Sequence, residues 1–373
     1  MRRVCGIALA LLSVVMGLSH PNACQTNADL RTYFKKNIGL NQGQVDRIRD
    51  GKPVTKEIKS RTPADIIVFG AVYINASPEA YIRLSNDFDR LRLLPVYQRI
   101  AKFSSPVVLS DLDGFSFEAD DVKELKSCKP GECKIQLPAQ SMEAYQNSIN
   151  WNVPDVQERV NQLLRQRTSE RLEAYQREGN PALITYDDKD EPVNTGKQFE
   201  ALLRYAQILP SNLPEFHRYL LAYPNARPAN TRDMFYWANE KFGLRPTLRV
   251  IHVITMQAQA GNETAYAIAE KQLYASHYFQ TALNLCFLVR NPDSSKPAGF
   301  YLLRAMGSTQ AGLTGFKGSI IRRKAVKQAD SFLREWLQDV RNDLENEGNE
   351  QTPECVPSAV AKCVSTGLSQ RSK

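Results

Sequence analysis

Histidine is scarce in this chain, and its few positions limit the acid–base and metal chemistry that the sequence can support. The chain of 373 residues has four histidines, of which His217, His252 and His277 follow residue 24. In a strand, His252 shares one face with Val250 and Ile254 and therefore points to the apolar side. A histidine in that position is more often a hydrogen-bonded core residue than a catalyst.

His277 stands among hydroxyl and aromatic side chains at the expected start of a strand. If His252 and His277 converge with Tyr266 and Arg304, these polar groups would fix the head of a ligand inside an apolar cavity. The alternative is that they satisfy one another within the core. Ser276 does not form a nucleophile–base pair with His277, because neighbouring residues of a strand point to opposite faces.

Motifs that would fix a reaction are missing from the sequence. Residues 307–311 depart from the nucleophile elbow of hydrolases at the last glycine, and the glycines up to 318 lack the spacing of phosphate-binding loops. The acidic run 187–191 could collect calcium, but a solvated turn is the commoner explanation of such a run. The sequence therefore predicts no metal and no cofactor, and it leaves open whether the chain is an enzyme.

Seven cysteines occur, and two pairs are candidates for disulfides. Cys128 and Cys133 flank the turn sequence Lys-Pro-Gly-Glu, and Cys355 and Cys363 bracket the C-terminal tail. In an exported chain both pairs predict disulfide bonds. A four-cysteine metal site is the rival interpretation, although these spacings are not those of zinc knuckles. Cys286, within a predicted strand, is expected to be a buried free thiol.

The N-terminus predicts export. Arg2 and Arg3 precede an apolar run over residues 4–18, which small and polar residues follow. That order is typical of a secretory signal peptide, here residues 1–24, and the run is shorter than the roughly 20 residues of a membrane span. We expect a periplasmic or extracellular protein, with cleavage after Ser19 or near Cys24, and no transmembrane segment in the mature chain.

The net charge of the chain is modest for its length. The formal charge is +8, and the largest basic cluster comprises Arg322, Arg323, Lys324 and Lys327. A nucleic-acid-binding protein would concentrate more lysine and arginine beside aromatic residues, so we expect no nucleic-acid partner. The cluster either makes a peripheral contact with anionic membrane lipid or forms the solvated start of a helix.

The candidate polar residues lie within a series of predicted strands. Apolar and polar residues alternate over 248–256, 265–273 and 277–289, and again from Phe300 through Leu302, Arg304 and Met306. Short connections between these strands favour an antiparallel meander. An earlier strand over 65–74 leads into a helix over 78–91, for which Ser77 is the N-cap and Pro78 the first residue.

The period then changes from two to between three and four. Apolar residues follow this period over 321–344: Ile321, Ala325, Ala329, Phe332, Leu333, Trp336, Val340 and Leu344. They predict a long helix whose apolar stripe covers the preceding sheet. Helical patterns also fill the middle of the chain, at 156–179, 195–203, 213–221 and 231–242.

The expected fold class is α+β, an antiparallel sheet wrapped around a long C-terminal helix, with a helical insertion. We divide the chain into a signal peptide (1–24), an N-terminal helical segment (25–64), the first part of the core (65–138), the insertion (139–245), the strands with the closing helix (246–346) and a polar tail (347–373).

This order resembles the helix-grip fold of START-related and polyketide-cyclase-like proteins. The likeness lies in residues 66–91, above all Val72-Tyr73-Ile74-Asn75-Ala76-Ser77-Pro78-Glu79-Ala80, and in residues 247–345. In that family a curved antiparallel sheet wraps the closing helix and leaves an apolar cavity for a lipid, sterol or polyketide. This sequence departs from the compact form of the family by the insertion of about a hundred residues, the size of a small domain.

Our first hypothesis is an exported protein that binds or carries an apolar small molecule or lipid between the sheet and the C-terminal helix. The expected ligand-binding residues are His252, Tyr266, His277, Arg304, Met306, Phe332 and Trp336. An envelope hydrolase or cyclase that uses His277 as acid or base is one alternative. A structural or partner-binding protein, with its interface on the inserted helices, is another.

Overall fold

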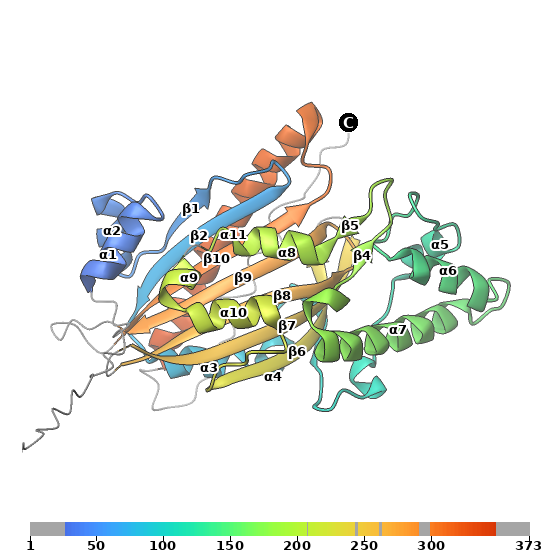
Figure 1. Ribbon diagram of the computed structural model, residues 1–373, viewed down its shortest axis with the longest axis horizontal. Coiled ribbons are helices and arrows are strands. Elements are labelled where there is room, and N and C mark those ends of the chain that lie inside the picture. The colour runs from blue at the N-terminus through green and yellow to red at the C-terminus, as the bar shows by residue number, and fades with distance from the viewer. Residues whose placement is uncertain (1–26, 207, 243–244, 261–262, 291–298, 348–373) are drawn as a thin grey trace, which may run out of the picture.

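A large antiparallel sheet with helices on both faces organises the chain (Figure 1). The computed structural model describes residues 27–206, 208–242, 245–260, 263–290 and 299–347. The fold is α+β, with a long C-terminal helix. The predicted signal peptide and the pair Cys355 and Cys363 lie outside the described residues.

The main sheet has eight strands in the order β1-β2-β10-β9-β8-β7-β6-β3, and all neighbours are antiparallel. The strands are β1 (Val54–Ile58), β2 (Asp65–Ile74), β3 (Tyr97–Lys102), β6 (Thr231–Phe242), β7 (Arg245–Ala260), β8 (Glu263–Ala275), β9 (Phe279–Arg290) and β10 (Phe300–Gln310). The predicted meander is confirmed, because each strand from β7 to β10 pairs with the next. The last strand, β10, then pairs with β2 from the first part of the chain.

Strand β2 has the predicted bounds, and all ten of its residues are buried. Val68 and Val72 belong to the core on one face of the sheet, whereas Phe69 and Ala71 belong to the core on the other. A strand covered on both faces requires apolar residues at odd and even positions alike, which explains its unbroken apolar sequence.

The long helix α11 (Gly315–Glu347) crosses one face of the sheet. Its residues Leu333 and Leu337 are fully buried against β2, where a Cβ atom added to Gly70 would come within 2.9 Å of both side chains. Helix and strand can approach so closely because Gly70 has no side chain. The predicted apolar stripe is confirmed, but its centre runs through Leu333 and Leu337, and Phe332 is 41% exposed.

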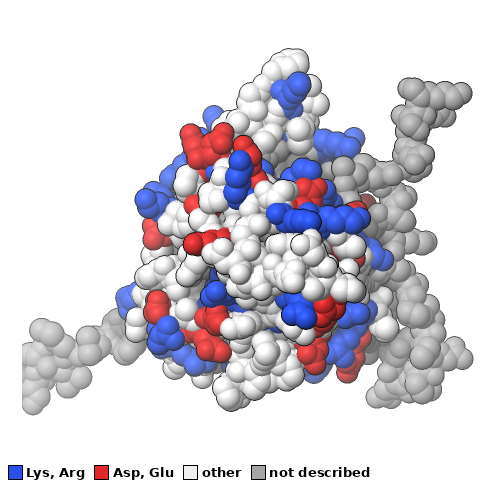
Figure 2. Space-filling model, turned by 90° about the vertical axis from the view of Figure 1, so that its right-hand side faces the viewer, with Lys and Arg blue, Asp and Glu red and all other residues white. Residues whose placement is uncertain are grey.

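Helices from two other regions cover the opposite face (Figure 1). The N-terminal region supplies α1 (Asn27–Lys36) and α2 (Gln42–Arg49). The insertion between β3 and β6 supplies η1 (Leu109–Leu112), α5 (Ala119–Leu125), α6 (Ala139–Ser148), α7 (Val156–Glu178), η2 (Asn180–Ala182), β4 (Thr185–Tyr186), β5 (Val193–Asn194), α8 (Thr195–Leu203), α9 (Ile208–Asn212) and α10 (Pro214–Ala222). At the end of the molecule that carries α5, α6 and α7, basic and acidic side chains are interspersed (Figure 2).

Residues 231–242 form strand β6, so the prediction of a helix there is wrong. Thr231 and Gly243 resemble helix caps in the sequence, yet the whole segment pairs with β7, from Thr231 opposite Met256 to Phe242 opposite Arg245. Pairing with β3 and β7 supplies the backbone hydrogen bonds that the helix would have made, so tertiary context overrides local preference. The segment therefore belongs to the sheet, and the helical part of the insertion ends before residue 231.

The predicted helix over 78–91 is two helices, α3 (Pro78–Ser85) and α4 (Phe88–Leu91). Ser77 caps α3 as predicted, by accepting a hydrogen bond from the backbone of Ala80. The side chain of Asp87 accepts a hydrogen bond from the backbone of Arg90 and starts a second helix. A new N-cap inside a helical pattern divides the helix, because its oxygen competes for the backbone N–H groups.

Candidate functional site

Three neighbouring strands bring polar side chains together on the face of the sheet that α11 crosses. Arg304 of β10 donates from Nη2 to Oε2 of Glu270 on β8 at 2.9 Å. Asn284 of β9 donates from Nδ2 to the same oxygen at 2.9 Å. We call these three residues the Arg304 cluster. The side chains of Arg304 and Glu270 are 10% and 27% exposed, so this ion pair is largely withdrawn from water.

Arg304 is held as a fixed cation with one donor unused. Burial is the largest single effect and lowers the pKa of its guanidinium, but Glu270, Cys286, Tyr81 and Tyr236 together outweigh burial and raise that pKa. The guanidinium carbon lies 4.3 Å from the centre of the Trp336 ring, which favours a cation over its face. The Nε atom is buried and has no hydrogen-bond partner among the described residues. An acceptor brought to this atom would remove the cost of that lost hydrogen bond.

A second ion pair lies farther across the sheet, on β6 and β7. Arg249 donates to both carboxylate oxygens of Glu240, at 3.1 and 3.0 Å, and to Gln272 at 3.2 Å. The phenol of Tyr236 interacts electrostatically with the charges of Glu270 and Glu240. Burial, with these charges adding to it, raises the pKa of Tyr236 well above its usual value. Its hydroxyl therefore remains protonated and can donate a hydrogen bond.

Helices α3 and α4 reach over this part of the sheet. The Tyr81 hydroxyl of α3 lies 3.6 Å from Sγ of Cys286, and its ring meets that of Trp336 edge-on at 6.3 Å. Phe88 of α4 meets Tyr236 edge-on at 5.8 Å. Cys286 is a buried free thiol, as predicted. Tyr81 of α3 and Trp336 of α11 thus border the Arg304 cluster, and Phe88 of α4 packs beside Tyr236.

Only part of this face is filled by α11. Against β2 the helix packs directly, through Leu333 and Leu337. Across β6, β7, β8 and β10, several large apolar side chains of the same face are only half-buried: Met234, Val253, Tyr266 and Met306. Apolar surface of this kind next to a fixed polar group is typical of the lining of a ligand site.

The structure brings together some of the predicted ligand-binding residues and separates others. Arg304, Met306 and Trp336 lie on the α11 side of the sheet. Tyr266 lies there too, and its hydroxyl donates to Glu79 at 3.4 Å. Phe332 is partly exposed to solvent, and its neighbour Leu333 takes the inner position.

His252 lies on the other face of the sheet, beneath the insertion, so it does not meet Arg304. It is fully buried, as the alternation in its strand predicts. Its Nε2 atom lies 2.9 Å from Oδ1 of Asp233, and its Nδ1 atom lies 3.0 Å from the hydroxyl of Tyr175. A carboxylate only accepts, so Nε2 carries the hydrogen and Nδ1 accepts from Tyr175. Burial lowers the pKa of His252 to about 4, although Asp233 opposes this effect.

The chain of hydrogen bonds continues on both sides of His252. The side-chain Nζ atom of Lys271 donates to the Tyr175 hydroxyl at 3.2 Å and also to Oδ1 of Asn180. At the other end, the hydroxyl of Tyr219 donates to Asp233 at 2.8 Å. Lys271 is 1% exposed, and burial lowers its pKa well below the usual value. This network is satisfied within the core, which is the commoner role that the sequence suggested for His252.

His277 is buried in the turn that joins β8 to β9. Its Nε2 atom lies 3.2 Å from Oδ2 of Asp121 in α5, and Arg245 donates to the other oxygen of that carboxylate at 3.2 Å. These contacts attach the insertion to the sheet. His277 therefore lies apart from the Arg304 cluster, whose residues belong to β8, β9 and β10.

Sequence reasoning missed Glu270, Asn284, Arg249 and Tyr236. The first three could have been found, because each sits at an alternating position of a predicted strand. Tyr236 could not, because its segment was predicted to be helical. The structure also places Cys128 and Cys133 at disulfide-bonding distance, with their sulfur atoms 2.07 Å apart.

Across the part of the chain that the structure describes, no group of three or more His, Cys, Asp or Glu residues could hold a metal ion. Among the same residues, no helix is long and apolar enough to cross a membrane. Comparison of the chain with protein-family models, with curated proteins and with solved structures finds no match.

Proposed function

We propose that this protein binds a small, largely apolar molecule on the α11 side of its sheet, with the polar end of the ligand at Arg304. The observation that carries the proposal is the buried Nε–H of Arg304, a donor without an acceptor beside half-buried apolar side chains. A ligand oxygen at this atom would complete the hydrogen bonding of the guanidinium, and the remainder of the ligand would cover Val253, Met306 and Trp336.

A helix-grip architecture fits this proposal. Strand β2 is followed by two short helices, the chain then forms a meander, and the final strand β10 returns to pair with β2. Helix α11 follows β10 and crosses the same face as α3 and α4. In the helix-grip proteins that the sequence resembles, the equivalent face encloses the apolar ligand.

The charges at the site favour a neutral polar group on the ligand. Glu270 already balances the charge of Arg304, at 2.9 Å, so a second carboxylate would bring an uncompensated charge into a largely buried place. A carbonyl or hydroxyl oxygen can accept from Nε without adding charge. We therefore propose a lipid or polyketide-like molecule with a neutral oxygen at one end.

The protein is also proposed to act outside the cytoplasm. The sequence of residues 1–24 supports export, and the Cys128–Cys133 pair is compatible with an oxidising compartment.

Native mass spectrometry of the gently extracted protein addresses both proposals, because it measures the mature N-terminus and any retained small molecule together. An intact N-terminus would remove the support for export, and a protein without ligand under every extraction condition would count against carriage.

Binding can be measured with the neutral fluorescent probe N-phenyl-1-naphthylamine and competing long-chain alcohols and fatty acids. We expect saturable binding of the probe, with alcohols displacing it better than acids of equal length. Arg304→Lys keeps the charge next to Glu270 but removes the planar Nε–H, and should weaken alcohol binding about tenfold. Arg245→Lys makes the same chemical change at Asp121, away from the site, and should have no effect. Absence of saturable binding by the wild-type protein would refute the proposal.

A further inference from the structure

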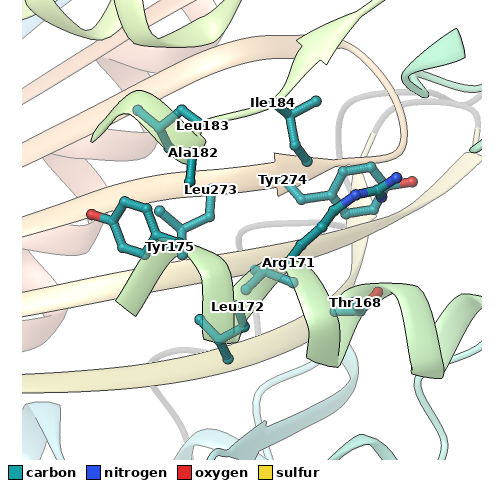
Figure 3. Close-up of a pocket in the computed structure, with 10 residues that line it drawn as sticks. Thr168, Arg171, Leu172, Tyr175, Ala182, Leu183, Ile184, Leu273 and Tyr274 are labelled. Atoms are coloured by element: carbon teal, nitrogen blue, oxygen red, sulfur yellow. The ribbon is translucent and has the colours of Figure 1, made fainter. Parts of the chain in front are cut away.

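A pocket of about 30 Å³ lies between α7 and the sheet (Figure 3). Its lining belongs to the core on the face of the sheet opposite the Arg304 cluster. Helix α7 contributes residues spaced along one side, among them Thr168, Arg171 and Tyr175. On the sheet side, the pairing of β7 with β8 shifts register between Val250 and Ile251. The resulting bulge turns the successive residues Leu273 and Tyr274 toward the same pocket.

Arg171 brings a positive charge to this pocket that nothing in the described chain balances. Its guanidinium donates to the hydroxyl of Ser141, and no carboxylate among the described residues lies within the 4.0 Å of an ion pair. The groups of opposite electrostatic effect on it are instead the phenols of Tyr274, Tyr145 and Tyr186. Burial lowers the pKa of Arg171, but an arginine remains charged in proteins. Arg171 is half-buried, and a charged group partly removed from water is ordinarily paired with an opposite charge.

Tyr274 adds an unused donor to the same place. Its side chain lines the pocket and is 5% exposed, and its hydroxyl has no hydrogen-bond partner among the described residues. Burial raises the pKa of Tyr274 well above the usual value, so the hydroxyl keeps its proton. The neighbouring Tyr186 differs, because its hydroxyl accepts from the backbone N–H of Ala275 at 2.9 Å and donates to the carbonyl of the same residue.

We propose that this pocket binds a small monovalent anion, chloride or a short carboxylate, between the guanidinium of Arg171 and the hydroxyl of Tyr274. The volume of the pocket limits the size of the anion. A single water needs about 10 to 15 Å³ measured in the same way, so about 30 Å³ holds an ion of only a few non-hydrogen atoms. The apolar part of the pocket lining limits the anion to a single negative charge. Leu172, Leu183 and Ile184 would leave the second charge of a divalent anion without compensation.

The test is thermal unfolding of the full mature chain at constant ionic strength, with sodium gluconate replaced stepwise by sodium chloride or sodium acetate. Gluconate is too large for the pocket and controls for general salt effects. An anion that binds only the folded protein raises the unfolding temperature with its concentration, in a saturable way. We expect such a rise with chloride, with acetate or with both, and the two titrations distinguish the halide from the carboxylate.

Two variants assign the effect to the pocket. Arg171→Met removes the charge and should abolish the anion-dependent rise, whereas Arg177→Met, at an exposed arginine of the same helix, should preserve it. Tyr274→Phe removes one donor to an anion and should raise the apparent Kd about tenfold, which keeps the test decisive if the Arg171 variant does not fold. The proposal is overturned if neither anion stabilises the wild-type protein more than gluconate does, or if Tyr274→Phe leaves the apparent Kd unchanged.

Discussion

The buried neutral His252 should make the stability of the protein fall in mild acid, and the size of the effect follows from its surroundings. The pKa of its imidazole is about 4 in the folded protein against 6.5 for an exposed histidine. Below pH 6.5 the unfolded chain gains a proton that the folded protein does not accept until about pH 4. The free energy of unfolding therefore decreases as the pH falls through this interval, and this contribution is complete above pH 6.5.

The expected magnitude is about 3 kcal/mol. The two pKa values differ by about 2.5, and each unit corresponds to about 1.4 kcal/mol. The variant His252→Gln cannot gain the proton, yet its amide can still donate to Asp233. Between pH 7 and pH 4 the wild-type protein should lose about 3 kcal/mol more than this variant does. Urea unfolding followed by tryptophan fluorescence at half-unit pH steps measures both curves.

His217 provides the control, because it is half-buried on α10 and burial lowers its pKa, and among the described residues no carboxylate forms a hydrogen bond with it. The variant His217→Gln should leave most of the acid-dependent loss in place. Equal pH dependence of the wild-type and His252→Gln proteins would refute the reasoning, since it would mean that His252 accepts its proton in the folded state as readily as in the unfolded chain.

Two further predictions concern the same face of the sheet. Gly179→Ala should lower the free energy of unfolding by at least about 3 kcal/mol in urea titrations, because Gly179 has φ +72° and a Cβ atom would lie 1.6 Å from the carbonyl oxygen of Tyr223. Gly312→Ala has a similar φ of +75° with nothing within 4 Å, so a loss of more than about 2 kcal/mol there would contradict this account. Lys271→Met should raise stability at pH 7 by about 1 kcal/mol, since the folded protein no longer has to bury an amine whose charged form burial disfavours. The variant should also lose part of the rise in stability that the wild-type protein shows between pH 7 and pH 10. A strong destabilisation at pH 7 would show that the two hydrogen bonds of Lys271 outweigh the cost of burying its amine.

The sheet and its closing helix were predictable because each element has its own period. Alternation over β7 to β10 identified the strands, and it placed Arg304 and Met306 on a common face. What alternation cannot decide is which helix will cover that face. His252 and Arg304 both lie at alternate positions of their strands, yet they point to opposite sides of one sheet, and only the three-dimensional arrangement separates them.

The pocket beneath α7 was even harder to predict from the sequence. A strict period of two assigns Leu273 and Tyr274 to opposite faces, and the bulge opposite Val250 and Ile251 turns both to one side. The sequence does not predict the uncompensated charge of Arg171 either. Acidic residues lie near Arg171 along α7, but they pair with other arginines, as Glu170 does with Arg167. Local sequence reports which charges are neighbours on a helix, and it does not report which of them the fold will leave without a partner.

The pairing of β2 with β10 also determines when the chain can become a native protein during synthesis. Tyr73 lies opposite Tyr301, so the two strands meet across roughly 230 residues of chain, and such long-range contacts form slowly. Until β10 has left the ribosome, the apolar edge of β2 lacks its main partner, and α11 has not been made to cover it. Truncation before residue 300 should therefore yield an aggregation-prone chain rather than a smaller stable domain. The nascent chain has to be kept from misassembly until β10 and α11 have been synthesised.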